Sequence, residues 1–283
     1  MMGWEWILII CVIIVAVFGT WTLSRRYIAG SAAKPVRNIP PEYIKGLNYV
    51  LNEQQDKAID VFIKMLEVDS DTVETHLALG NLFRRRGEVD RAIRIHQNLI
   101  ARPTLSEEDH SLALLELGTD YMRSGLLDRA ESLFTELVHS GNHTAQAYKE
   151  LLDIYQQEKD WQQAITTANR LQLISGDEFS PMVSQFNCEL AEEYLSEGNT
   201  REAREHIKRA LNIDPGCVRA SLLEAQLALQ EGKVKPALKS FRRIEKQDPA
   251  YLSEAIDPIM HCYRELGKPE ECMNYLKEIV HKY

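Results

Sequence analysis

The length, composition and charge of the chain describe a folded, acidic protein. Of its 283 residues, 45% are hydrophobic and 27% are charged, and the formal net charge at pH 7 is −9. These fractions are typical of a folded chain with an exposed polar surface. The negative charge argues against nucleic-acid binding, so we expect no nucleic-acid partner.

The N-terminal stretch Trp6–Leu23, WILIICVIIVAVFGTWTL, has 18 residues and no charge. A helix of this length spans about 27 Å, close to the thickness of a bilayer core. No Lys or Arg precedes the stretch, whereas Arg25, Arg26, Lys34 and Arg37 follow it. The positive-inside rule then places the N-terminus outside and the rest of the chain in the cytoplasm. The sequence therefore predicts one N-terminal transmembrane helix.

A cleaved signal peptide is the competing interpretation of this stretch, since Ala29–Ala33 offers small residues for cleavage. A signal peptide needs a basic region before its apolar run, and here the basic residues lie after it. We predict a membrane anchor at residues 1–28, with its span at about 6–23. A short linker at 29–41 contains three prolines, and a repeat array occupies 42–283.

The stretch His76–Ile100 is typical of two amphipathic helices joined at Gly87, a residue suited to the left-handed turn that ends a helix. Gly80 lies inside the first helix, where a glycine costs about 1 kcal/mol relative to alanine and so needs a packing reason. The sequence predicts that Gly80 leaves room for the second helix to cross, and that Ala92 fills this room from the other side.

The same spacing recurs along the chain with steps of 34, 38, 34, 39, 34 and 35 residues. The paired positions, twelve residues apart, are Gly46–Ala58, Gly80–Ala92, Gly118–Ala130, Leu152–Ala164, Ala191–Ala203, Ala225–Ala237 and, more weakly, Met260–Cys272. A period of 34 residues with these small positions is the tetratricopeptide pattern. It predicts an all-α, right-handed solenoid of about seven helical hairpins. The two longer steps predict insertions in the turns around Arg102–Glu108 and Ser175–Pro181.

The motifs of common enzymes and metal sites are absent from the sequence. It contains no Gly-x-Ser-x-Gly, no phosphate-binding loop and no His-Glu-x-x-His. His139 and His143 lie near each other without a cysteine or carboxylate cluster, and we interpret them as solvated loop residues. The five cysteines include no Cys-x-x-Cys pair and are expected to be reduced thiols that fill small apolar spaces. We therefore expect no catalytic residue, no metal, no cofactor and no small-molecule substrate.

The most distinctive polar feature is a group of cations around the first helix of the second repeat. Its members are Arg84, Arg85, Arg86, Arg91 and Arg94. A solvated face with ordinary ion pairs accounts for the last three. Arg84 and Arg85 have no acidic partner at i±4 on their own helix, and Arg123 is the equivalent of Arg85 in the next repeat. Together with Asn81, these three arginines are predicted to bind an acidic segment of a protein partner.

Three segments resemble the lipopolysaccharide assembly protein B (LapB, YciM) family of Gram-negative bacteria. They are YIKGLNYVLNEQQDKAIDVFIKML (Tyr43–Leu66), HLALGNLFRRRGEVDRAIRIHQNL (His76–Leu99) and LGTDYMRSGLLDRAESLF (Leu117–Phe134). The N-terminal anchor followed by repeats is similar as well. The resemblance implies a non-enzymatic inner-membrane adaptor that promotes degradation of the deacetylase LpxC by the membrane protease FtsH. It also implies restraint by the periplasm-facing protein PbgA (YejM).

The resemblance leaves two other functions to be weighed. One is a scaffold that assembles proteins of lipopolysaccharide synthesis and export, and the other is a metal-dependent redox sensor or enzyme. Family members continue with further repeats and a rubredoxin-like module in which two Cys-x-x-Cys pairs bind iron. The 283 residues contain no such pair. The iron-site residues cannot be carried over, and this counts against the redox function.

Overall fold

The computed structural model describes residues 40–68 and 72–283, and within them every regular element is a helix. The elements are α2 (Pro41–Leu51), α3 (Gln55–Val68), α4 (Val73–Arg85), α5 (Val89–Ile100), α6 (Glu107–Arg123), α7 (Leu127–Ser140), α8 (Thr144–Glu158), α9 (Trp161–Ser175), α10 (Ser180–Ser196), α11 (Thr200–Ile213), α12 (Val218–Gln230), α13 (Val234–Gln247), the 3₁₀ turn η1 (Pro249–Tyr251), α14 (Leu252–Glu265) and α15 (Pro269–Lys282). Among these helices, none is both long and apolar enough to cross a membrane. The predicted span at residues 6–23 and most of the predicted linker lie outside the described residues.

The chain divides into two compact units, residues 1–65 and 66–283. In the first unit, α2 and the greater part of α3 form a helical hairpin. Phe62 of α3 is fully buried and its ring lies against Gly46 of α2. The Tyr43 ring packs on the same side chain, with 5.6 Å between the ring centroids.

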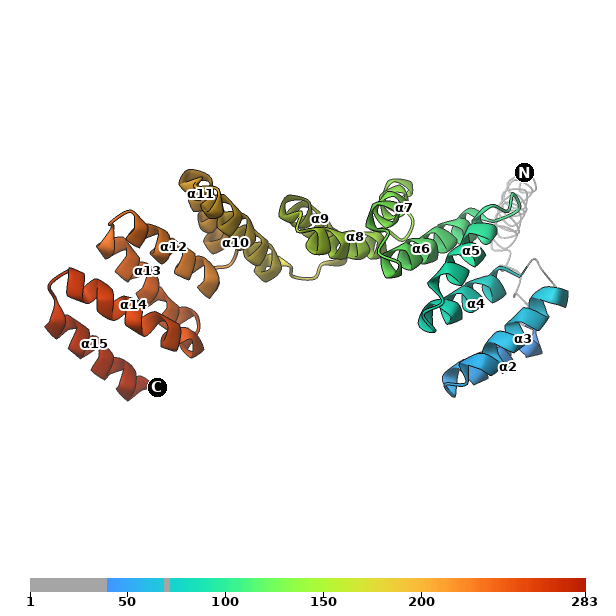
Figure 1. Ribbon diagram of the computed structural model, residues 1–283, viewed down its shortest axis with the longest axis horizontal. Helices are drawn as coiled ribbons and strands as arrows, with labels where there is room; N and C mark the ends of the chain where they lie inside the picture. The colour runs from blue at the N-terminus through green and yellow to red at the C-terminus, as the bar shows by residue number, and fades with distance from the viewer. Residues whose placement is uncertain (1–39, 69–71) are drawn as a thin grey trace, which may run out of the picture. The chain divides into compact units, whose positions relative to one another are not determined.

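The second unit consists of six successive hairpins, α4/α5 to α14/α15 (Figure 1). The second helix of each hairpin packs against the first helix of the next one, as α5 does against α6. First helices of neighbouring hairpins also meet directly in three places, α4 with α6, α6 with α8 and α10 with α12. The predicted all-α tetratricopeptide fold is confirmed.

The turn inside each hairpin requires one residue with a left-handed backbone. Gly87 has φ of +82°, and the glycines at the equivalent positions of four later hairpins also have positive φ. In α8/α9 the equivalent residue is Lys159, with φ of +59°. Because a side chain is disfavoured at positive φ, glycine recurs at this position and the predicted turns are confirmed.

The reason for glycine inside the first helices differs from the one predicted. Ala92 is fully buried, as expected, but a Cβ atom built on Gly80 would collide with the imidazole of His96, one turn further along α5. In α6/α7 a Cβ on Gly118 would lie 2.6 Å from Cε1 of Phe134, a residue with no exposed surface. The glycine therefore leaves room for a ring sixteen residues later, not for the alanine.

The same two positions show an exchange of size in α8/α9. There Leu152 takes the place of the glycine, and Ala168 takes the place of the ring; both are buried. In this hairpin a large residue on the first helix and a small one on the second fill the crossing point, the reverse of the order in α6/α7.

The two longer repeat steps lie where the sequence predicts, but they have a different structure. Helices α6 and α10 each have 17 residues, compared with 13 in α4 and 13 in α12. Helix α6 begins at Glu107 and α10 at Ser180, inside the segments predicted to be turns. Much of each insertion therefore forms an added helical turn at the start of a first helix.

Gly118→Ala is expected to destabilise the protein, although alanine normally favours a helix interior by about 1 kcal/mol. The new methyl group overpacks the contact with Phe134, which typically costs about 1–3 kcal/mol. Thermal or denaturant unfolding measures the effect. As a control, Phe134→Leu in the same chain shortens the opposing side chain and should recover part of the loss. A Gly118→Ala protein as stable as the parent would contradict the crossing-point explanation.

Candidate functional site

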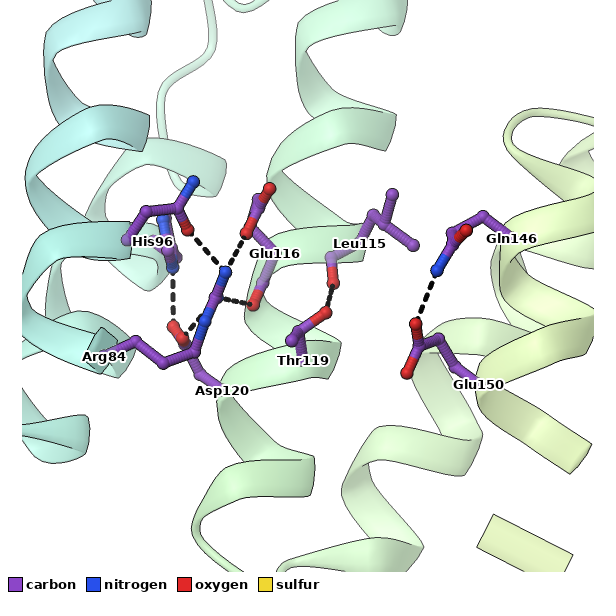
Figure 2. A network of polar contacts seen from close by, with 9 residues as sticks. Arg84, His96, Leu115, Glu116, Thr119, Asp120, Gln146 and Glu150 are labelled. Atoms are coloured by element: carbon purple, nitrogen blue, oxygen red, sulfur yellow. Dashed lines mark hydrogen bonds and ion pairs between the residues drawn. The ribbon is translucent and has the colours of Figure 1, made fainter. Parts of the chain in front are cut away.

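A buried group of polar side chains joins helices α4, α5 and α6, and we call it the Arg84 cluster. Its members are Asn81 and Arg84 from α4, His96 from α5, and Glu116 and Asp120 from α6. Figure 2 shows the Arg84 guanidinium pointing from α4 toward the two carboxylates of α6, with His96 on the far side of Asp120. The cluster thus connects one hairpin to the next.

Arg84 uses both terminal nitrogens of its guanidinium group. Nη1 donates to Oδ1 of Asp120 at 2.7 Å and to the backbone carbonyl oxygen of Glu116 at 3.1 Å. Nη2 donates to Oε2 of Glu116 and to Oδ1 of Asn81, each at 2.6 Å. The side chain is 15% exposed, so these charge-assisted bonds lie largely outside the solvent.

His96 and Asp120 form the inner half of the cluster. Nδ1 of His96 lies 2.5 Å from Oδ2 of Asp120, and neither side chain has exposed surface. Nε2 of the ring is buried against Gly80 and has no hydrogen-bond partner within the described part of the chain. We therefore assign a proton to Nδ1, which donates to Asp120, and leave only a lone pair unpaired at Nε2.

The charges of the cluster keep Arg84 ionised. Burial alone would lower the pKa of Arg84, but the hydrogen bonds and negative charges of Glu116 and Asp120 outweigh it and raise the pKa. One guanidinium thus faces two carboxylates, one of which is completely buried. Such a pair is costly to desolvate and also costly to break from one side.

Two members of the cluster occupy positions that are apolar in the neighbouring hairpins. His96 stands where the neighbouring hairpins have Phe62 and Phe134, and Asp120 stands where they have Leu82 and Ile154. The sequence therefore contained a signal of a buried polar contact, because His96 and Asp120 stand at core positions of neighbouring helices. The analysis of repeat spacing did not use this signal.

The structure divides the four residues that the sequence predicted as a partner-binding group. Asn81 and Arg84 are together, but in contact with each other and with α6. Arg85 and Arg123 are exposed, and each lacks a hydrogen bond or ion pair to any described residue. The sequence indicated that Arg84 has no acidic partner at i±4 on its own helix, and its carboxylate partners in fact lie 32 and 36 residues away on α6. Partner binding by Arg85 and Arg123 stays a prediction.

The surface beside the cluster continues onto helix α8. There Gln146 donates to Oε1 of Glu150 at 2.5 Å, as Figure 2 shows. Burial raises the pKa of Glu150, and the nearby charges of Asp153 and Glu116 act in the same direction. The hydrogen bond from Gln146 and the charge of Arg84 oppose this shift. Glu116 of α6 and Glu150 of α8 thus lie within their helices, whereas the exposed Arg85 and Arg123 are the last residues of α4 and α6.

The side chains that could bind a metal ion are those of His, Cys, Asp and Glu. Across the residues that the structure describes, no three His, Cys, Asp or Glu side chains come together in a way that could hold a metal ion. The polar groups of the Arg84 cluster are used to hold hairpins together. The cations Arg85 and Arg123 are exposed and take no part in this cluster.

Arg84→Glu is expected to lower the free energy of unfolding by about 3 kcal/mol or more, because it leaves Asp120 buried without its cation. Arg85→Glu is the matched control on the adjacent residue, and its effect should stay within about 0.5 kcal/mol. Denaturant unfolding of both variants makes the comparison. Equal stability of the two would show that the contacts of Arg84 do not stabilise the fold.

Replacing Arg84, His96 and Asp120 together by apolar residues is expected to lower the free energy of unfolding far less than removing Asp120 alone. The triple variant Arg84→Met, His96→Phe and Asp120→Leu uses residues of the kinds found at these positions in other repeats. Apolar replacement of a buried ionic group is often neutral or stabilising, whereas loss of one partner costs about 3–5 kcal/mol. Asp120→Leu alone should therefore be the less stable protein in denaturant unfolding. The reverse order would rule out the argument.

The comparisons with known proteins agree with this fold. Tetratricopeptide repeat family models match residues 75–110, 115–179 and 194–255. Among solved structures, the C-terminal part of a tetratricopeptide repeat protein from Cytophaga hutchinsonii is similar, with a TM-score of 0.52 and 15% identity. The match covers 84% of this chain and 94% of that one, and it shows the fold alone.

Relatives of known name are much closer in sequence. Lipopolysaccharide assembly protein B of Escherichia coli is 38% identical over 267 residues, which are 94% of this chain and 68% of the relative. The protein of the same name from Haemophilus influenzae is 38% identical over 263 residues, covering 90% of this chain and 66% of the relative. The predicted resemblance is confirmed, and the chain belongs to the lipopolysaccharide assembly protein B family.

Proposed function

We propose that the protein is a non-enzymatic adaptor in lipopolysaccharide assembly. The observation that carries this proposal is the 38% identity, over 94% of the chain, to a relative named lipopolysaccharide assembly protein B. The helical hairpins support it, since tetratricopeptide arrays present side chains of successive helices to protein partners. The Arg84 cluster supports it as well, because its polar groups hold neighbouring hairpins together rather than facing a substrate.

In the finer form of the proposal, the adaptor is anchored in the inner membrane by residues 6–23, with its N-terminus in the periplasm and its repeats in the cytoplasm. It presents LpxC to the membrane protease FtsH and so limits lipopolysaccharide synthesis, and PbgA (YejM) restrains it. The Lys and Arg residues that follow the apolar stretch support this orientation. A membrane anchor would raise the effective concentration of the adaptor near a membrane protease.

Arg85 and Arg123 are the residues that we propose for contact with the partner. Each is exposed, unpaired among the described residues, and placed at or next to the C-terminal end of a first helix, α4 or α6. Cations at these positions suit an acidic segment of a partner protein.

The adaptor function is tested by the lifetime of LpxC in cells that lack the protein. We expect LpxC to persist without it and to be degraded again when the full chain is restored. Residues 40–283 alone, at the same abundance, should not restore degradation. If the full chain leaves LpxC turnover unchanged and captures only proteins of lipopolysaccharide export, the alternative scaffold function is the better one.

The charge-reversed variant Arg85→Glu with Arg123→Glu should weaken capture of the acidic partner by roughly tenfold, or about 1.4 kcal/mol, since exposed ion pairs contribute little each. Capture of LpxC and of FtsH is measured from membranes across a salt series. The capture by the parent chain should fall as salt rises, because salt screens exposed charges.

The matched control is Arg94→Glu with Arg170→Glu, on the second helices α5 and α9. Both arginines are exposed, and each double reversal changes the net charge by −4, from −9 to −13. The control should capture the partners like the parent. Equal capture by both variants at every salt concentration would show that Arg85 and Arg123 are ordinary solvated residues with no role in partner binding.

A further inference from the structure

Two cysteines that are distant in the sequence meet between helices α10 and α12. Sγ of Cys188, in the middle of α10, lies 3.8 Å from Sγ of Cys217, the residue that precedes α12. Cys188 is fully buried and Cys217 is 3% exposed. Both are free thiols in the structure. A disulfide bond needs about 2.0 Å between the sulfurs, so they have to approach by about 1.8 Å.

The surroundings of Cys217 favour its thiolate form. Its sulfur accepts a hydrogen bond from the backbone N–H of Ala220 at 3.4 Å, as the N-terminal cap of α12. Nε2 of Gln185 donates to the same sulfur at 3.5 Å. The hydrogen bond from the Cys188 thiol lowers the pKa of Cys217, against the opposing effect of burial, and the same bond raises the pKa of Cys188. The N–H groups of Ala220 and Gln185 donate to the sulfur of Cys217, and on this geometry we assign Cys217 as the nucleophile.

The nucleophile lies close to the surface. Cys217 is in the turn between α11 and α12, and the Gln185 side chain that contacts its sulfur is exposed. Cys188 lies deeper and has no exposed surface. Both thiols are buried, and the turn position of Cys217 makes it the nearer of the two to the surface, with Cys188 3.8 Å away as the resolving thiol.

Ion pairs between side chains join α10 and α12 beside the two cysteines. Arg219 of α12 binds Glu189 of α10 through Nη1 at 2.6 Å and Glu192 through Nη2 at 2.9 Å. These three side chains are partly exposed. In the sequence, the two glutamates follow Cys188 and the arginine follows Cys217. The ion pairs keep α10 and α12 in register and hold the sulfurs near each other.

We propose that Cys188 and Cys217 form a reversible disulfide when the protein meets hydrogen peroxide, and that this bond locks α10 to α12. The Cys217 thiolate attacks one peroxide oxygen, the O–O bond breaks, hydroxide leaves, and a sulfenic acid remains on Cys217. Cys188 gives its proton to that hydroxide, forming water, and its sulfur attacks the Cys217 sulfur. The S–O bond breaks as the S–S bond forms, and the departing hydroxide takes up the proton that Cys217 released to solvent on ionising and leaves as a second water. In total, two thiols lose two electrons and two protons, and one peroxide becomes two waters.

The consequence would be local. The bond closes a loop between residues 29 apart in sequence and restricts the unfolded chain, so the oxidised protein should unfold at a higher temperature. It joins two first helices that pack directly. A dithiol reductant should reverse the change.

The test uses the purified full chain, reduced and then exposed to hydrogen peroxide. After denaturation, we expect thiols open to alkylation to fall from five to three per chain. Peptide mapping should find one disulfide, between Cys188 and Cys217, and dithiothreitol should restore all five thiols. The control Cys262→Ser with Cys272→Ser keeps the proposed pair, and its thiols should fall from three to one.

Two single variants test the order of attack. Cys188→Ser should stop at a sulfenic acid on Cys217, which dimedone traps, whereas Cys217→Ser should leave Cys188 reduced. A wild-type chain in which Cys188 and Cys217 stay reduced while Cys262 or Cys272 is oxidised would overturn the proposal. Dimedone labelling of Cys188 in the Cys217→Ser variant would overturn the assigned roles. The mapping of the wild-type chain decides the main point even if a serine variant fails to fold.

Discussion

The hairpins of this protein depend on the volume at one crossing point between their two helices. Where the first helix has a glycine, the second helix places a ring in the space, as Phe62 does over Gly46 and Phe134 over Gly118. Where the first helix has Leu152, the second has only Ala168. Interiors are packed at crystal-like density, so in these hairpins a small residue on one helix is matched by a larger one on the other. The repeated helix spacing follows from this constraint.

The Arg84 cluster is a consequence of the same constraint. His96 takes the place of a phenylalanine over Gly80, but unlike phenylalanine it brings two ring nitrogens into a dry interior. One nitrogen needs a partner, and Asp120 supplies it from the next hairpin. A buried carboxylate in turn needs a cation, and Arg84 supplies it. A single polar substitution at the crossing point thus requires a chain of partners across two hairpins. Such a chain fixes the register of α4 and α6 at the cost of desolvating several charges.

The sequence predicts what depends on local spacing. The helix pairs, the turn residue at Gly87 and the buried alanines follow from a period of 34 residues, because the repeat places equivalent residues in equivalent surroundings. The partner of Gly80 and the partners of Arg84 were missed for one reason. A helix-by-helix search for acids at i±4 does not see Asp120, which is 36 residues from Arg84. Comparison of equivalent positions between repeats would have found it, since histidine and aspartate there replace phenylalanine and leucine.

The arginines of the second unit fall into two groups, those that join neighbouring helices and those that are exposed to a partner. Arg84 holds α4 to α6 and Arg219 holds α10 to α12, and each of these arginines contacts two carboxylates. Arg85 and Arg123 contact no carboxylate within the described part of the chain, so a partner could bind them without breaking an ion pair between hairpins. The α10–α12 interface also contains the adjacent thiols of Cys188 and Cys217. Each repeat contacts only its neighbours in a solenoid. A covalent bond at that interface would therefore stiffen one joint of the array and leave the free cations of α4 and α6 unchanged.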